Sequence, residues 1–459
     1  MQAALNHNQL QYVLFHLNQH IDLTDKIRNA IQYTDQISDT NAIIFKRSNM
    51  NLRLDKQIEY QTESIPNIFP VGEKKQWFEL EGNALIFYHD ILKATFYLLS
   101  GYQEYKSESV DHMDRFQYKN SIQEQLQIVQ KPIVNYYFQI ISEGIELYCN
   151  SNNISFKRKR LFDNYGFMLT HDVDRVDYYH WRETAYKVMQ LLGLKKAHYD
   201  KKRLAKATLN AIIPSIFPGY KDDPWWNFKE LRQLEKSLNL KSVWYFLNRD
   251  GSPHDAKYNL EEPRIRQLIN KLETQGCEVG LHGSIKTATN DSAFKKAKNR
   301  LDKLTSLPCK GTRQHFLKFH YPLTLQIQIN NGLRYDTSMG YAEHEGFRNS
   351  YCYAFKPYDH ANNRMMDIWE LPLTTMDTTL FGYRKLNYNE MNSSFEYLIE
   401  EIKKFGGLMV MLWHNCNFDE YEYPGIKDYY FSQLQAIAKT KPESVTGADV
   451  LQRLLKLSI

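Results

Sequence analysis

The chain has 459 residues, of which 42% are hydrophobic and 24% charged, as is typical of a globular protein of two or three domains. A formal net charge of +5, with basic residues spread along the chain, argues against a nucleic-acid partner. There is no run of 18 apolar residues and no leader-like start, so we expect no signal peptide, no integral membrane segment and a cytoplasmic location. Oligomeric state cannot be predicted from these features.

Residues 1–155 are predicted to form a separate accessory domain, α/β or mainly helical. The stretch Asn83–Tyr105 has the pattern of a buried helix with aromatic faces, and a second long helix is predicted from Pro132 to about Tyr148. Polar residues at Asn150–Asn153, followed by the basic cluster Lys157–Arg160, mark the expected boundary. This cluster is interpreted as a solvated linker, and a second one, Lys201–Arg203, as a solvated helix end.

From residue 156 to the end, short apolar runs alternate with helical patterns. The predicted strands are Gly166–Thr170, Ser242–Leu247, Glu278–Leu281, Gly311–Phe316, Leu333–Asp336, Trp369–Leu373 and Leu408–Trp413. The predicted helices include Pro263–Gln275, Asp291–Lys303, Asn389–Lys404 and Ile426–Ala438. Seven strands with helices between them predict a parallel α/β sheet or barrel, whose chemistry lies at the carboxyl ends of the strands.

The long connection 175–240 is an insertion in this pattern. It contains a predicted helix, Trp181–Leu194, and an apolar segment, NAIIPSIFPG. A lid or a docking surface for a membrane or partner is one interpretation, and a helical insertion packed on the barrel is the preferred one.

Reactive side chains follow several of the predicted strands. The first strand runs into His171-Asp172-Val173-Asp174, where one carboxylate can bind a metal while the other handles a proton. His282 follows the third strand, and Arg313 and His315 alternate along the fourth.

Two further reactive segments complete the rim. Met376-Asp377 comes after the sixth strand, and Trp413-His414-Asn415 ends the seventh. An exposed His after a buried strand is a natural general acid or base.

The motifs LTHDVD, EVGLHGS, GTRQHFLKF, YDTSMGYAEHEGFR, LPLTTMD and LWHN, in this order, resemble those of the polysaccharide deacetylases of carbohydrate esterase family 4. The stretch FYHDILKATFYLLSGYQEY resembles an accessory domain of unknown function that precedes the deacetylase domain in a bacterial branch. The resemblance covers most of the chain. It implies a distorted seven-stranded (β/α) barrel over residues 156–459.

The resemblance also implies roles for single residues. Asp172 would be the base, Asp174 and His282 metal ligands, Arg313 the brace of the base, and His414 the catalytic acid beside Trp413. The family's second histidine ligand is replaced by Lys286, which is protonated at neutral pH and cannot bind a cation in that form. We expect His315, on the adjacent strand, to take its place.

The implied reaction is metal-dependent removal of an N-acetyl or O-acetyl group from an amino sugar or polysaccharide in surface-polysaccharide metabolism. The expected metal is zinc, with nickel, cobalt or manganese as alternatives. The predicted sugar contacts are Trp413, Asp377 and Asn415.

Three other functions stay open at this point. One is a scaffold or interaction protein, a role that the N-terminal domain could have whatever the other domain does. A glycosyltransferase could also use an Asp-x-Asp motif, although it would leave Arg313, His315 and His414 without roles. A non-catalytic sugar-binding relative would explain Lys286 but would need neither a base nor an acid.

Overall fold

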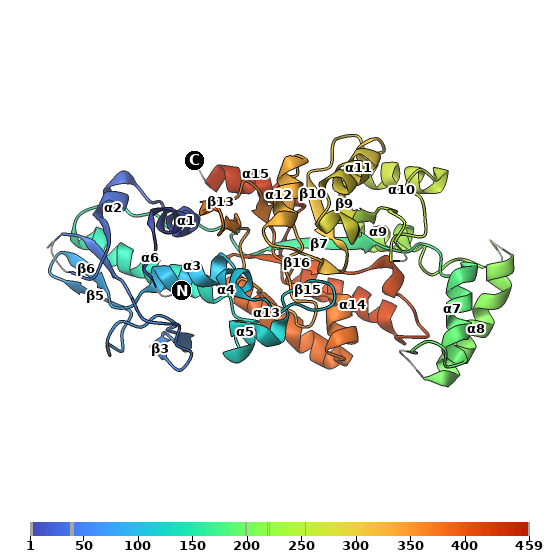
Figure 1. Ribbon diagram of the computed structural model, residues 1–459, viewed down its shortest axis with the longest axis horizontal. Helices are drawn as coiled ribbons and strands as arrows, with labels where there is room; N and C mark the ends of the chain where they lie inside the picture. Colours follow the sequence, from blue (N-terminus) through green and yellow to red (C-terminus); the bar gives the residue numbers. More distant parts are fainter. Residues whose placement is uncertain are drawn as a thin grey trace.

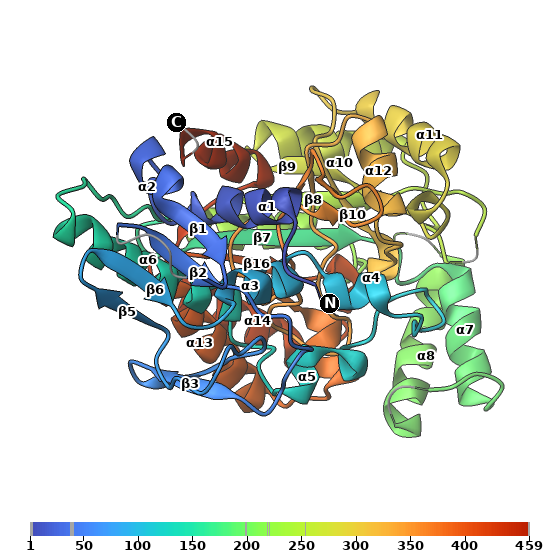
Figure 2. The same cartoon turned by 60° about the vertical axis from the view of Figure 1, so that its left-hand side comes forward.

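Two separate β-sheets organise the chain in the computed structural model, which describes residues 3–36, 41–197, 200–217, 219, 221–252 and 254–457 (Figure 1). The smaller sheet lies in the N-terminal part and the larger one in the C-terminal part. Figure 2 brings the N-terminal part forward. No helix within the described ranges has both the length and the apolarity needed to cross a bilayer.

The N-terminal sheet has four strands in the order β1-β2-β6-β5, with β1, β2 and β6 parallel and β5 antiparallel to β6. Its bounds are β1 (Ile31–Thr34), β2 (Ile43–Lys46), β5 (Phe78–Glu81) and β6 (Ala84–Phe87), and a separate hairpin joins β3 (Gln57–Tyr60) to β4 (Glu63–Pro66). The helices are α1 (His7–Leu17), α2 (Asp25–Ala30), α3 (Ile91–Leu99), α4 (Tyr102–Lys106), α5 (Ile122–Gln125) and α6 (Ile133–Ser151). This part is therefore α/β.

The predicted single helix over Asn83–Tyr105 is wrong at its start. Ala84–Phe87 forms the fully buried strand β6, and helix α3 begins only after Asp90, whose carboxylate caps it by accepting the Lys93 backbone N–H at 3.0 Å. A short apolar run of this kind does not distinguish a buried strand from a helix. The helix predicted from Pro132 is confirmed as α6, with Pro132 at its N-cap.

The larger sheet contains all seven predicted strands, and they are parallel. The order is β14-β11-β10-β9-β8-β7-β16-β15, with β17 paired to β7. The bounds are β7 (Gly166–Val173), β8 (Ser242–Leu247), β9 (Glu278–Gly283), β10 (Gly311–Gln314), β11 (Tyr335–Asp336), β14 (Trp369–Glu370), β15 (Thr375–Met376), β16 (Leu408–Leu412) and β17 (Glu443–Ser444).

One short segment brings the two edges of this sheet together. Strand β14 pairs with β11 at one edge, and β15 pairs with β16 at the other. Only Leu371–Thr374 separate β14 from β15 in the chain. The sheet is therefore curled, and the predicted distorted (β/α) barrel is confirmed. Its sixth strand is divided into β14, which pairs with β11, and β15, which pairs with β16.

Helices surround the larger sheet. They are α9 (Phe228–Ser237), α10 (Pro263–Thr274), α11 (Asp291–Asp302), α12 (Leu323–Asn330), α13 (Tyr388–Phe405), α14 (Ile426–Lys439) and α15 (Gly447–Leu457). The insertion contributes two more, α7 (Trp181–Leu191) and α8 (Lys201–Ile216). These two helices stand at the edge of the molecule in both views, so the preferred interpretation of an insertion packed on the barrel holds only for its ends (Figures 1 and 2).

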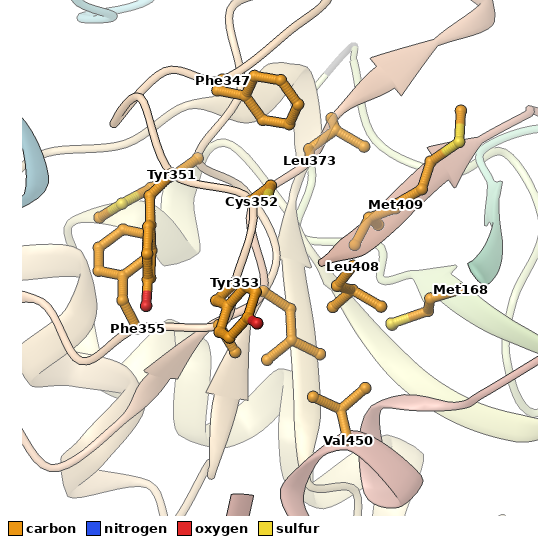
Figure 3. Close-up of a cluster of buried hydrophobic side chains, with 14 of the residues drawn as sticks. Met168, Phe347, Tyr351, Cys352, Tyr353, Phe355, Leu373, Leu408, Met409 and Val450 are labelled. Carbon is orange, nitrogen blue, oxygen red and sulfur yellow. The ribbon is translucent and has the colours of Figure 1, made fainter. Parts of the chain in front are cut away.

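A long segment between β11 and β14 joins the two parts of the molecule. It includes the small hairpin of β12 (Tyr358–Asp359) and β13 (Arg364–Met365). Tyr351, Tyr353 and Phe355 of this segment lie on the same hydrophobic cluster as Leu408 and Met409 of β16 (Figure 3). The same continuous cluster includes α1, α3 and α6 from the N-terminal part, so the two parts share one core.

Backbone hydrogen bonds reinforce this junction. The Phe347 N–H donates to the Val129 carbonyl at 2.6 Å, and the Val134 N–H donates to the Ser350 carbonyl at 2.8 Å. Between these contacts, Gly346 adopts φ +129, and a Cβ atom there would lie 2.3 Å from the Val129 carbonyl oxygen. Only glycine fits this close approach of two chain segments.

We therefore expect Gly346→Ala to lower the free energy of unfolding by about 2–4 kcal/mol, measured by chemical denaturation. Gly276→Ala is the matched control, because Gly276 also has a positive φ of 79 but meets no atom within 4 Å. The control should cost only about 1 kcal/mol. Equal losses in the two variants would show that the approach to Val129 does not restrict position 346.

Candidate metal centre and active site

Strand β7 places two carboxylates at the rim of the barrel. It is buried along its whole length between β8 and β16, and side chains alternate along it. His171, on the opposite face from Asp172, is held by the Trp413 carbonyl at 2.8 Å and by Glu235 at 3.0 Å. Asp172 and Asp174 therefore share the face that points into the barrel.

Asp174, His282 and His315 form a cluster that could hold a metal ion, with one ligand atom from each residue within 4.8 Å of the others. His282 Nε2 lies 3.3 Å from Asp174 Oδ1, and His315 Nε2 lies 3.6 Å from Asp174 Oδ2. The three residues come from the ends of β7, β9 and β10. One carboxylate and two imidazoles are a common ligand set for zinc and similar divalent cations.

The hydrogen bonds of these residues fit metal binding. His282 Nδ1 lies 2.9 Å from the Arg313 carbonyl, which can only accept, so Nδ1 carries a proton and Nε2 is the ring nitrogen available for a metal. His282 Nε2 and Asp174 Oδ1 are both buried without a hydrogen-bond partner. Unpaired buried polar atoms are costly, and a cation between them would satisfy both.

Charge effects differ between the members of the cluster. Burial by itself would lower the pKa of His282, but the Asp172 and Asp174 carboxylates raise it. Burial alone would raise the pKa of Asp174, but His315 and His282 lower it well below its ordinary value. Burial lowers the pKa of His315, which favours the neutral ring that a metal requires. The expected replacement of the missing histidine by His315 thus agrees with the geometry, while Lys286 lies exposed in the turn Lys286–Ala288.

A fully buried arginine holds the second carboxylate. Arg313 Nη1 donates to Asp172 Oδ1 at 2.9 Å and to Thr170 Oγ1 at 2.8 Å, and its Nε donates to the Thr337 carbonyl at 3.0 Å. The other oxygen of Asp172 lies 3.6 Å from His282 Nε2. Asp172 is therefore fixed beside the cluster without being one of its three ligands.

His414 approaches the cluster from the opposite side. Its Nε2 lies 3.8 Å from Asp174 Oδ2, and its Nδ1 lies 2.8 Å from Asp377 Oδ1. Burial by itself would lower the pKa of His414, but the Asp377 carboxylate, with Asp174 and Asp172, raises it to about 9. The ring is thus protonated at neutral pH.

The structure gives each of the three predicted sugar contacts a partner within the protein. Asp377 accepts from the His414 backbone N–H at 2.7 Å as well as from its ring, so it positions His414. Trp413 is fully buried against Tyr430. The Asn415 side-chain amide donates to the Arg175 and Trp225 carbonyls. A contact of these three residues with a sugar stays a prediction.

Phe316 is an aromatic residue beside the cluster that is open to solvent, and the sequence analysis gave it no role. It is 40% exposed and stacks on His315 with ring centroids 4.0 Å apart. Phe316 and Leu317 adopt positive φ values of 60 and 54, an unfavourable conformation for side-chain-bearing residues.

The N-terminal part holds this strained turn in place. Arg115 Nη1 donates to the Phe316 carbonyl at 2.8 Å, and Asp114 pairs with Lys318 at 2.6 Å. Asp111 in turn fixes the Arg115 guanidinium at 2.7 Å. These partners lie about 200 positions apart in the chain, so no local pattern could have linked residues 111–115 to His315.

Residues 2–148 match the model of a family of unknown function, DUF7033. No curated protein sequence matches the chain.

Among solved structures, a putative polysaccharide deacetylase from Mycobacterium smegmatis is similar at 12% identity and a TM-score of 0.41, over 64% of this chain and 91% of that one. A probable polysaccharide deacetylase from Pseudomonas aeruginosa PAO1 is similar at 14% identity and a TM-score of 0.41, over 63% and 91%. A CE4 family pseudoenzyme from Bacillus anthracis is similar at 8% identity and a TM-score of 0.29, over 50% and 61%. Identities this low leave the chemistry to be judged from the side chains.

We expect the purified protein, stripped of metal and titrated with zinc, to bind about one ion per chain. His282→Ala and His315→Ala should each remove a ligand and weaken binding by at least about tenfold, measured by calorimetry or chelator competition. Lys286→Ala is the control and should bind like the wild type. Absence of binding with zinc, nickel and cobalt alike would contradict the assignment.

Proposed function

We propose that the chain is a metal-dependent hydrolase that removes acetyl groups from an amino sugar or polysaccharide, in surface-polysaccharide metabolism. One observation carries the proposal. On a single barrel rim, a three-residue cluster suited to a divalent cation lies between a carboxylate held by an arginine and a histidine held by a carboxylate. Hydrolysis of an amide needs these three functions: an electrophilic centre, a base and an acid.

Asp174, His282 and His315 would hold the cation, for which zinc fits best. When bound, the cation polarises the acetyl carbonyl and makes a water molecule more acidic. The other steps belong to the side chains of the chain itself.

Asp172 takes the proton from the attacking water. Arg313 orients this carboxylate, because its guanidinium donates to one oxygen and leaves the other free for the proton. His414 then gives its proton to the departing amine, which must be protonated before it can leave. Asp377 keeps that histidine charged and turns its Nε2 towards the cluster.

The proposal is tested by acetate release from N-acetylated amino-sugar oligosaccharides. We expect His414→Ala and Asp172→Ala each to lower kcat by about 10²–10⁴ while the bound metal is retained, because each removes one proton-transfer group. Metal content measured on the same samples separates a catalytic defect from a lost site. Near-normal turnover in His414→Ala would refute its role as the acid.

A protein that binds both metal and acetylated oligosaccharides but releases no acetate would instead be a non-catalytic sugar-binding relative. The replacement at Lys286 is the observation in favour of that second function.

The pH dependence follows from the raised pKa of His414, which is about 9. Activity requires the protonated ring, so kcat/KM should fall as pH rises through this pKa. Asp377→Asn removes the negative charge that stabilises the imidazolium, so its alkaline limb should move to lower pH.

A bound cation lowers the pKa in both proteins, so the difference between the two profiles carries the test. Asp367→Asn, at an exposed carboxylate paired with Lys356, is the control and should leave the profile unchanged. Coincident alkaline limbs in the wild type and Asp377→Asn would show that another group sets the limb.

A further inference from the structure

The α7–α8 hairpin, residues Trp181–Phe217 apart from positions 198 and 199, exposes an unusual amount of apolar surface. It projects at one end of the molecule, away from the N-terminal part (Figures 1 and 2). Of the twenty large hydrophobic residues that are exposed in the described ranges, ten belong to it: Trp181, Tyr186, Val188, Leu192, Leu194, Leu209, Ile212, Ile213, Ile216 and Phe217. Single exposed apolar residues are ordinary, but such a concentration marks an interaction site.

Helix α8 exposes several large apolar side chains. A helix that served only to pack on its neighbour would bury them. Its buried positions are mostly small or polar, including Ala207, Thr208 and Ala211. Leu209 and Ile216 on its outer face are 69% and 64% exposed, and Phe217, just after the helix, is 64% exposed. Apart from the buried Leu204, the larger apolar side chains of α8 thus face outward, and the packing within the hairpin leaves them uncovered.

The hairpin is also strongly basic. Residues 181–217 contain eight Lys and Arg against two Asp and Glu, a formal net charge of +6, whereas the whole chain carries +5. Six of these cations surround the turn between the helices at exposed positions: Lys195, Lys196, Lys201, Lys202, Arg203 and Lys206. The interpretation of Lys201–Arg203 as a plain solvated helix end therefore leaves out the apolar surface beside it.

We propose that the α7–α8 hairpin is a docking surface for an anionic lipid bilayer. Exposed Trp, Phe, Leu and Ile side chains combined with Lys and Arg are the composition of helices that lie in the membrane interface. The apolar side chains enter the boundary between headgroups and acyl chains, while the cations meet lipid phosphates. Neither helix of the hairpin is long and apolar enough to span a bilayer, so the attachment is peripheral.

The ends of the hairpin connect this surface to the barrel rim. The Tyr178 and Tyr179 N–H groups donate to Asp223 at 3.0 and 3.1 Å, which ties the two ends together. Asn415, the residue after His414, donates to the Arg175 carbonyl at 2.7 Å and to the Trp225 carbonyl at 2.9 Å. A docked hairpin would hold the rim beside the bilayer. If the proposed function holds, the substrate class that we infer is acetylated sugars attached to lipid.

The test is co-flotation of the full chain with vesicles of phosphatidylcholine containing phosphatidylglycerol, compared with phosphatidylcholine alone. We expect binding to the mixed vesicles to fall at least about tenfold in the triple variant I213S/I216S/F217S, because three inserting side chains are removed. The variant V110S/L307S/L455S, at exposed apolar positions elsewhere, is the matched control and should bind normally.

Charge is tested separately with K201Q/K202Q, which should weaken binding to the mixed vesicles by about fivefold for each residue. K295Q/K296Q, on exposed positions of α11, should have no effect. Circular dichroism should be unchanged in all four variants, because the altered side chains are exposed. Equal binding by wild type and I213S/I216S/F217S, or no binding to mixed vesicles at all, would overturn the proposal.

Because flotation needs no substrate, its outcome does not depend on deacetylase activity. Release of acetate from a soluble acetylated oligosaccharide should be the same in I213S/I216S/F217S as in the wild type. Release from an N-acetylated glycolipid in mixed vesicles should fall with binding. Equal turnover of the glycolipid by the two proteins would overturn the inferred substrate class. It would not contradict the proposal that the hairpin docks on a bilayer.

Discussion

The guanidinium of Arg313 is the charge around which the barrel rim is organised. It is fully buried and donates to Thr170 and Asp172 of β7 and to Thr337 after β11, so it connects three strand ends across the barrel interior. A buried cation is tolerated only when it is paired and fully hydrogen-bonded. Its own carbonyl orients His282, so the positions of the proposed base, Asp172, and of one proposed metal ligand both depend on this residue.

The rim is assembled from both parts of the chain. The barrel supplies every side chain of the cluster, while the segment 111–115 holds the turn that carries His315. The hydrophobic core runs through both parts without interruption. A separate sheet in the N-terminal part therefore does not mean a separately stable unit.

Much of this architecture was predictable because it depends on local patterns. The seven apolar runs predicted the strands, and the parallel sheet then required Asp172, His282, Arg313 and His414 to meet at one edge. Ala84–Phe87 was misassigned because four buried apolar residues fit a strand and a helix equally well. The contacts of Asp377 and Asn415 depend on which way each side chain points after its strand. They were not predictable, because the alternation of side chains along a strand does not extend into a loop.

Contacts between distant segments were beyond prediction for a different reason. Arg115 carries no pattern that points to Phe316, and the outward-facing apolar side of α8 is visible only once its packing partner is known. The sequence did show the basic cluster Lys201–Arg203, but its meaning depends on the exposed apolar side chains beside it.

The hold of Arg115 on Phe316 has a consequence for the candidate metal centre. The backbone at Phe316 and Leu317 is kept in an unfavourable conformation from outside the barrel, so the energy stored there can be released by moving a residue of the accessory part. A change of the Arg115 side chain would therefore reach His315 through Phe316. The position of a candidate metal ligand in the barrel thereby depends on a residue of the accessory part.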